Sequence, residues 1–104
     1  MASTEAQVSM NGVSAVGAGT TVDFTTAKRC VTAVVVPSAT LSAGIVLIEA
    51  SQDSVNWVIE HVIDMSGRSN HSVCSAGVAF RYWRANIART VGGGTVRVTF
   101  MEAD

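Results

Sequence analysis

The side chains that could perform acid-base catalysis are few in this sequence. His61 and His71 are the only histidines. A catalytic nucleophile needs a base within hydrogen-bonding reach and a third group that orients this base. His61 lies inside an apolar run, on the face that we expect to carry Trp57 and Ile59, and no glycine-flanked serine motif accompanies it. We therefore predict that the protein is not an enzyme and has no catalytic residue.

Metal ligands are equally sparse. A structural metal site needs about four ligands at short spacings, and the two histidines do not combine in this way with Cys30 and Cys74, the only cysteines. His71 and Cys74 are three positions apart, which sends their side chains to opposite faces of a strand. We predict no metal and no cofactor. The N-terminal residues indicate no secretory signal, so we expect two buried free thiols.

Two short segments contain groups that bind ions in other proteins. Residues 53–56 (DSVN) supply carboxylate and amide oxygens, but the further oxygens and the terminal glutamate of a calcium loop are missing. We predict instead a hairpin turn in which Asp53 and Asn56 bond nearby backbone groups. The glycines at residues 92–94 precede a strand and not a GKS/T sequence and a helix, so they predict a tight connection and not a phosphate site.

The most distinctive segment chemically is residues 80–87 (FRYWRANI), in which aromatic residues and arginines are interleaved. Strand alternation places Tyr82 and Arg84 on one face, with Phe80 and Asn86, and Trp83 on the other face. Three interpretations remain open: core aromatics with arginines at strand ends or paired with Glu49, Glu60 or Asp64; an interface formed by Tyr82, Trp83 and Arg84; or stacking on sugars or nucleobases.

The elements that position these residues are short strands. Valine, isoleucine and threonine account for 32 of the 104 residues, against two leucines, and β-branched residues favour strands. Turn signals separate apolar-rich runs that we interpret as seven strands, at residues 20–25, 30–36, 44–51, 57–64, 71–75, 80–88 and 95–102. A leading strand at residues 7–13 would be the eighth. The prediction is an all-β fold: a single antiparallel β-sandwich, jelly-roll-like, with seven or eight short strands.

Length and charge limit the organisation and the partners. One domain is expected at this length, and we place the sandwich at residues 20–104. Residues 1–19, rich in serine, alanine and glycine, form an N-terminal arm that could become ordered only on assembly. The net charge of −1 gives no electrostatic footprint for nucleic acid, and no apolar run reaches the length of a membrane span. We therefore expect the protein to bind neither nucleic acid nor a membrane.

Two of the predicted strands are apolar on both faces. Residues 95–100 (TVRVTF) alternate strictly, which is typical of a strand with one face in the core, but residues 45–48 (IVLI) and 34–36 (VVV) do not alternate. Either loops cover the second apolar face of these strands or a partner subunit does. The interface candidates are Tyr82, Trp83, Arg84, Ile45, Leu47 and Val35.

Three segments carry a resemblance when they are taken in order: residues 45–57 (IVLIEASQDSVNW), 80–87 and 92–98 (GGGTVRV). They resemble the small β-sandwich or jelly-roll virion proteins of tailed bacteriophages. In that family a strand ends in Glu-small-Ser, a turn closes on Asn-Trp, and a Phe-Arg-Tyr-x-Arg-Ala-Asn strand precedes a glycine-rich turn and a last alternating strand. The similarity covers about residues 45–102. This chain has residues 53–55 (DSV) where the family often has glycine in the turn.

The resemblance implies a structural component of a virion. A lone domain without a repeat or heptad stretch suits a head decoration, or cement, protein, which binds across capsid subunits and stabilises the expanded head. The implied partner is the major capsid protein, the implied state is a homo-oligomer (dimer or trimer), and the implied location is the capsid surface after synthesis in the bacterial cytoplasm. The alternative is a glycan- or receptor-binding module of a tail or head fibre, or another tail or neck component.

Overall fold

The computed structural model describes residues 7–28, 30–70, 72–76 and 80–103, of which 28, 73–76 and 103 are described by their backbone alone. Within these ranges the chain forms nine strands and no helix. They are β1 (Gln7–Val13), β2 (Gly17–Ala18), β3 (Val22–Lys28), β4 (Cys30–Pro37), β5 (Ala43–Ser51), β6 (Trp57–Asp64), β7 (Ser72–Ala76), β8 (Phe80–Gly92) and β9 (Val96–Ala103). The described part of the chain accordingly has no helix long and apolar enough to cross a membrane.

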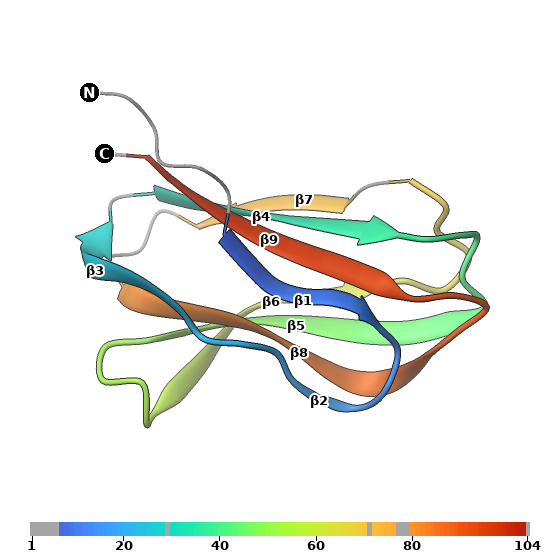
Figure 1. Ribbon diagram of the computed structural model, residues 1–104, viewed down its shortest axis with the longest axis horizontal. Helices are drawn as coiled ribbons and strands as arrows, with labels where there is room; N and C mark the ends of the chain where they lie inside the picture. Colours follow the sequence, from blue (N-terminus) through green and yellow to red (C-terminus); the bar gives the residue numbers. More distant parts are fainter. Residues whose placement is uncertain (1–6, 29, 71, 77–79, 104) are drawn as a thin grey trace.

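The strands form two antiparallel sheets that pack face to face (Figure 1). Sheet A has the order β1-β9-β4-β7 and sheet B has the order β2-β8-β5-β6, with β3 also paired to β8. Because β2 and β3 pair with successive parts of β8, they act as one interrupted strand at that edge. With β2 and β3 taken together, this is the strand order of a jelly roll. The predicted all-β sandwich is confirmed.

Most strand boundaries agree with the predicted runs. β1 and β6 coincide with residues 7–13 and 57–64, and the other strands shift by one to four residues at their ends. The largest difference is at β8, which continues through Gly92. The two-residue β2 was not predicted, and position 71 of the predicted run 71–75 lies outside the described residues.

The predicted N-terminal arm is wrong for residues 7–19, which belong to the sandwich. β1 pairs with β9, and Met10 is buried in the core. The Gly19 N–H donates to the Ala85 carbonyl at 2.8 Å, and the Ser9 hydroxyl accepts from the Ala85 N–H at 2.9 Å. Backbone pairing and one buried methionine hold this segment although its composition is polar. Residues 1–6 of the predicted arm lie outside the described residues.

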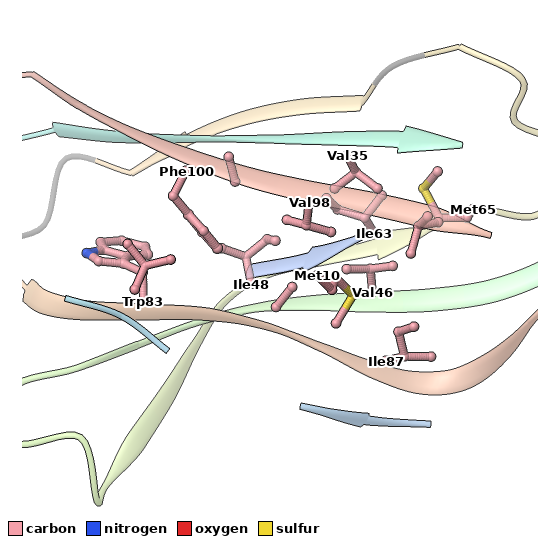
Figure 2. Packing of buried hydrophobic residues seen from close by; sticks show 14 of the residues in the cluster. Met10, Val35, Val46, Ile48, Ile63, Met65, Trp83, Ile87, Val98 and Phe100 are labelled. Carbon is pink, nitrogen blue, oxygen red and sulfur yellow. The ribbon is translucent and has the colours of Figure 1, made fainter. Parts of the chain in front are cut away.

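The core lies between the two sheets, and Trp83 lies at one end of it (Figure 2). The Trp83 ring packs edge-on against Phe80 with 6.3 Å between ring centroids, and against Phe100 at 6.2 Å. Its indole N–H donates to the Phe80 carbonyl at 3.0 Å, so the one polar atom of the side chain is satisfied. The alternation of β9 is confirmed, since Val98 and Phe100 are fully buried.

The hairpin turn between β5 and β6 is organised by the Asp53 carboxylate. This carboxylate accepts the backbone N–H groups of Asn56 at 2.8 Å and Val55 at 2.9 Å, and the Asn56 side-chain amide at 2.9 Å. Ser51 completes the turn by donating to the Asn56 carbonyl at 2.6 Å and accepting from the Ser54 N–H at 2.9 Å. The groups that donate to the Asp53 carboxylate, first of all the Asn56 N–H, hold the pKa of Asp53 well below its usual range. The predicted hairpin turn and the role of Asp53 in it are confirmed, whereas the Asn56 side chain bonds the Asp53 carboxylate and not a backbone group.

A β-bulge interrupts β6. Ile48 of β5 pairs with His61, and the next residue, Glu49, pairs with Ile59, so Glu60 is an extra residue on β6. His61 therefore lies on the side of the sheet that faces the core, whereas Ile59 faces outward. The prediction that His61 shares the face of Ile59 and Trp57 is wrong, because strict alternation does not continue through a bulge.

Candidate protein-binding surface

The face of sheet B that points away from the core collects four of the six interface candidates. Strand register places outward side chains in rows across β8, β5 and β6, for example Arg84 beside Glu49 beside Ile59. We call this surface the outer B face. Its members are Ile45, Leu47 and Glu49 on β5, Tyr82, Arg84, Asn86 and Arg89 on β8, and Trp57, Ile59, Val62 and Asp64 on β6.

An ion pair lies at the centre of the outer B face. Arg84 Nε donates to Glu49 Oε1 at 2.7 Å, and the Asn86 side-chain amide approaches Glu49 Oε2 at 3.3 Å. The side chains of Arg84 and Glu49 are 24% and 8% exposed. Of the arrangements that the sequence leaves open for the arginines of this strand, pairing with Glu49 across the sheet is the one that Arg84 adopts. Both oxygens of a nearly buried carboxylate thus have donors.

Trp57 covers one side of this ion pair. The Arg84 guanidinium carbon lies 4.0 Å from the centre of the Trp57 ring, which is cation–π distance. The guanidinium is therefore held both by a carboxylate and by an aromatic ring. Trp57 was absent from the predicted interface candidates. Its position at the first residue of β6, opposite Ser51 at the end of β5, is the signal that could have placed it on this face.

The apolar part of the outer B face consists of Ile45, Leu47, Ile59 and Val62, and the charged residues Asp64 and Arg89 flank Ile45 on β6 and β8. Ile45 and Leu47 are half-buried between neighbouring strands, since Leu47 is flanked by Asn86 on β8 and Val62 on β6. At the edge, Ile59 and Val62 are 53% and 64% exposed. A contiguous apolar area on a soluble domain is typical of an interaction site.

Trp83 and Val35 do not lie on this or any other surface. Both are fully buried in the core, so neither contacts a partner directly, and their inclusion among the interface candidates is corrected. Alternation correctly separates Trp83 from Tyr82 and Arg84, but it does not say which of the two faces is the inner one. Val35 occupies the inward face of β4, and its neighbours Val34 and Val36 are the half-buried outward residues.

The outer face of sheet A offers a weaker match to the candidates. β9 places Thr99 beside Val34 and Arg97 beside Val36, so polar and apolar residues mix across the two strands. Among the described side chains, this face brings together none of the predicted aromatic or arginine candidates. It therefore serves as a natural control surface.

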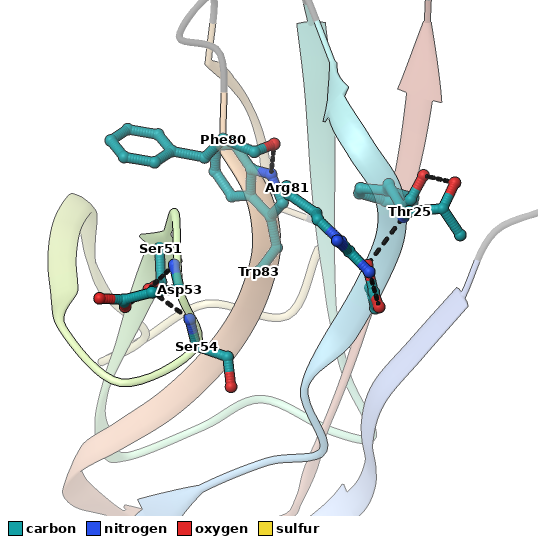
Figure 3. A network of polar contacts seen from close by, with 9 residues as sticks. Thr25, Ser51, Asp53, Ser54, Phe80, Arg81 and Trp83 are labelled. Atoms are coloured by element: carbon teal, nitrogen blue, oxygen red, sulfur yellow. Dashed lines mark hydrogen bonds and ion pairs between the residues drawn. The ribbon is translucent and has the colours of Figure 1, made fainter.

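A second arginine of β8 forms a more exposed pair (Figure 3). Arg81 donates from Nε to Asp23 Oδ1 at 2.7 Å and from Nη2 to Asp23 Oδ2 at 2.9 Å. The Arg81 hydrogen bonds, followed by the Thr25 N–H, lower the pKa of Asp23, and the same contact raises the pKa of Arg81. Both side chains are 40% exposed.

Candidate metal ligands are sparse in the described residues. No group of three or more His, Cys, Asp or Glu side chains in those ranges could hold a metal ion. Cys30 is a free thiol and is half-buried, whereas we predicted it to be buried. The side chain of Cys74 and all of His71 lie outside the described residues.

The chain matches no protein-family model, no curated protein and no solved structure.

Proposed function

We propose that this protein is a structural component of a bacteriophage virion, a capsid decoration protein that binds the major capsid protein through the outer B face. The observation that carries the proposal is the grouping of Tyr82, Arg84 and Trp57 beside Ile45 and Leu47. Tryptophan, tyrosine and arginine are the usual anchors of protein interfaces. The resemblance in residues 45–102 supplies the class of partner.

The geometry of Arg84 suits a binding role. Its guanidinium is already held by Glu49 at 2.7 Å and by the Trp57 ring at 4.0 Å. A long side chain that is fixed before binding loses less conformational entropy when a partner covers it. A protein that binds assembled capsid subunits but not the separate subunits shifts the equilibrium toward the assembled shell. A decoration protein stabilises the capsid in this way.

A glycan-binding role has less support from these contacts. That alternative depended on Tyr82, Trp83 and Arg84 acting together, and Trp83 is buried in the core. Trp57 could replace it, and because Arg84 covers one face of its ring, at most the other face is left for a sugar. Stacking on sugars needs an aromatic face that is free to contact the ring.

The proposal is tested by co-sedimentation of the purified chain with expanded phage capsids that lack their decoration protein. Two matched variants show which outer face binds the capsid: Leu47→Thr on β5 changes the outer B face, and Val36→Thr on β4 changes the outer face of sheet A. Both residues are half-buried on the outward face of a strand that has neighbours on either side. Both changes keep a residue of good strand propensity.

We expect Leu47→Thr to weaken capsid binding at least tenfold more than Val36→Thr, on the order of a hot-spot loss. Thermal unfolding of both variants checks that neither has lost its fold. Wild-type chain that stays in the supernatant at every capsid concentration would reject the decoration role. Equal losses for the two variants would reject the outer B face as the binding surface.

A further inference from the structure

β6 lies at the edge of sheet B, and its free edge is paired with no strand in the described part of the chain. Two large apolar residues on this strand, Ile59 and Val62, are 53% and 64% exposed on the outward side. Unpaired backbone N–H and C=O groups together with apolar side chains make an edge strand a template for pairing with another chain. This edge therefore needs an occupant.

We infer that β6 pairs antiparallel with β6 of a second copy of this chain, about a two-fold axis that passes between Glu60 and His61. This inference does not depend on the proposed capsid partner. The register follows from the symmetry: Trp57 lies opposite Asp64 of the second copy, and Val58 lies opposite its Ile63. Ile59 lies opposite its Val62, and Glu60 opposite its His61.

Because of the bulge, this register pairs side chains that point to the same face of the sheet. The pairing with β5 shows that Trp57, Ile59, Val62 and Asp64 point outward and that Val58 and Ile63 point toward the core side. In the two-fold register every outward residue therefore meets an outward residue. A partner strand without a bulge would have to place one of its residues opposite two residues of β6, as β5 does. Only then would the side-chain faces match on both sides of Glu60. A second copy carries the same extra residue, so the two strands match without a further bulge.

The side-chain pairs also favour this register over its neighbours. Ile59 against Val62 of the second copy buries the exposed apolar residues, and this contact occurs twice because of the symmetry. The carboxylate of Glu60 lies opposite an imidazole. A shift that centred the axis on Glu60 would place two carboxylates directly opposite each other, which is unfavourable. A shift that centred it on His61 would place outward Ile59 opposite core-side Ile63.

The dimer has a consequence for the surface described above. A two-fold axis perpendicular to the sheet keeps both outer B faces on the same side of the joined sheet. The dimer therefore presents two copies of Tyr82, Arg84 and Leu47 in one plane. Such an arrangement can bridge two neighbouring subunits of a larger assembly.

The first test is the mass of the purified chain by light scattering over a range of concentrations, without capsids. We expect twice the 10.8 kDa of one chain. The variant Ile59→Lys should raise the dissociation constant of the dimer by about a hundredfold, because the lysine ammonium would be buried opposite Val62 of the second copy without a partner. The matched control is Val55→Lys, which changes a 76% exposed valine in the turn outside β6 and should leave the dimer unchanged.

The second test fixes the register by cross-linking. Residues directly opposite in an antiparallel pair have Cα atoms about 4.5–5.5 Å apart, within the range of a disulfide. We expect Ile59→Cys and Val62→Cys chains to form a 59–62 cross-link when mixed under mild oxidation. Neither variant alone should cross-link at its new cysteine, since equivalent positions are about 10 Å apart along the strands. Peptide mapping distinguishes this bond from any bond to Cys30 or Cys74.

Each other outcome overturns the inference. A wild-type chain that stays monomeric at all concentrations has no such dimer. A dimer that Ile59→Lys and Val55→Lys affect equally is formed by another surface. A 59–59 or 62–62 cross-link gives a different register. Because none of these measurements includes capsids, a failure here leaves the capsid-binding test to decide the proposed function by itself.

Discussion

Strand β8 carries two arginine–carboxylate pairs that have the same closest N–O distance, 2.7 Å. They differ in geometry and in burial. Arg81 holds Asp23 with two parallel hydrogen bonds, and both side chains are 40% exposed. Arg84 holds Glu49 through Nε, and the carboxylate side chain is only 8% exposed. The exposed pair has the better fork geometry, and the buried pair has the drier surroundings.

This difference separates two sources of strength in an ion pair. Water screens the exposed pair, and two long side chains lose rotational freedom to form it, so its net contribution to stability is small in spite of the bidentate contact. The Glu49 carboxylate has already lost most of its water, so its partners cannot be replaced by solvent if they are removed. Burial and not contact geometry should therefore decide how much each pair matters for folding.

The largest expected effect is at Glu49. The variant Glu49→Ala leaves the Arg84 side chain, which is 24% exposed, without its carboxylate, and we expect the free energy of unfolding to fall by about 2–4 kcal/mol. Chemical denaturation of the wild type and the variant measures this. The control is the double variant Glu49→Ala/Arg84→Ala, which should cost less than the sum of the two single changes because no unpaired charge remains. A loss no greater than that of Asp23→Ala would contradict the ranking by burial.

A smaller effect is expected at Trp57, whose ring lies over Arg84. Trp57→Ala removes the cation–π contact, and we expect a loss of about 1–2 kcal/mol in the free energy of unfolding, measured in the same way. The variant also admits water to the guanidinium. The cost of Glu49→Ala should therefore be lower in the Trp57→Ala background than in the wild type. An unchanged cost would show that Trp57 does not shield the pair.

The sequence predicts one of these pairs better than the other because the two depend on different information. Glu49 was among three acidic residues considered for an arginine of β8, since cross-strand pairing follows from regular strands. The sequence does not predict Asp23 as a partner of Arg81, because Arg81 lies near the start of β8, where β3 pairs with it irregularly between Asp23 and Lys28. Strand existence and alternation are local properties of the chain, whereas irregular register depends on the neighbouring strand.

The same distinction explains the errors at the candidate surface. Alternation separated Trp83 from Arg84, but only the packing of the Trp83 ring against Phe80 and Phe100 determines which face is inside. No glycine or proline marks the bulge at Glu60, so the facing of His61 could not be predicted from spacing. Core packing resolves the first ambiguity, and the register between β5 and β6 resolves the second.

The smallest expected effect is at Asp23, and its dependence on pH and salt identifies it. The folded-state pKa of Asp23 is lowered from the ordinary value of 3.8, first of all by the Arg81 hydrogen bonds. A carboxyl with a lowered folded pKa stabilises the protein above its unfolded pKa, and this contribution is lost as the pH falls through the folded value. Asp23→Asn removes the charge at every pH. The melting temperature of the variant should therefore lie slightly below that of the wild type at pH 7.

This difference should shrink below about pH 3.8, and it should also shrink in high salt at pH 7, because exposed charges are screened. Thermal unfolding at pH 7 and pH 3, each at low and high salt, gives the four values required. Glu49→Gln is the comparison at neutral pH, since its effect should persist in high salt where the effect of Asp23→Asn fades. If salt reduced both effects equally, the two pairs would be solvated alike, and burial could not be the property that distinguishes them.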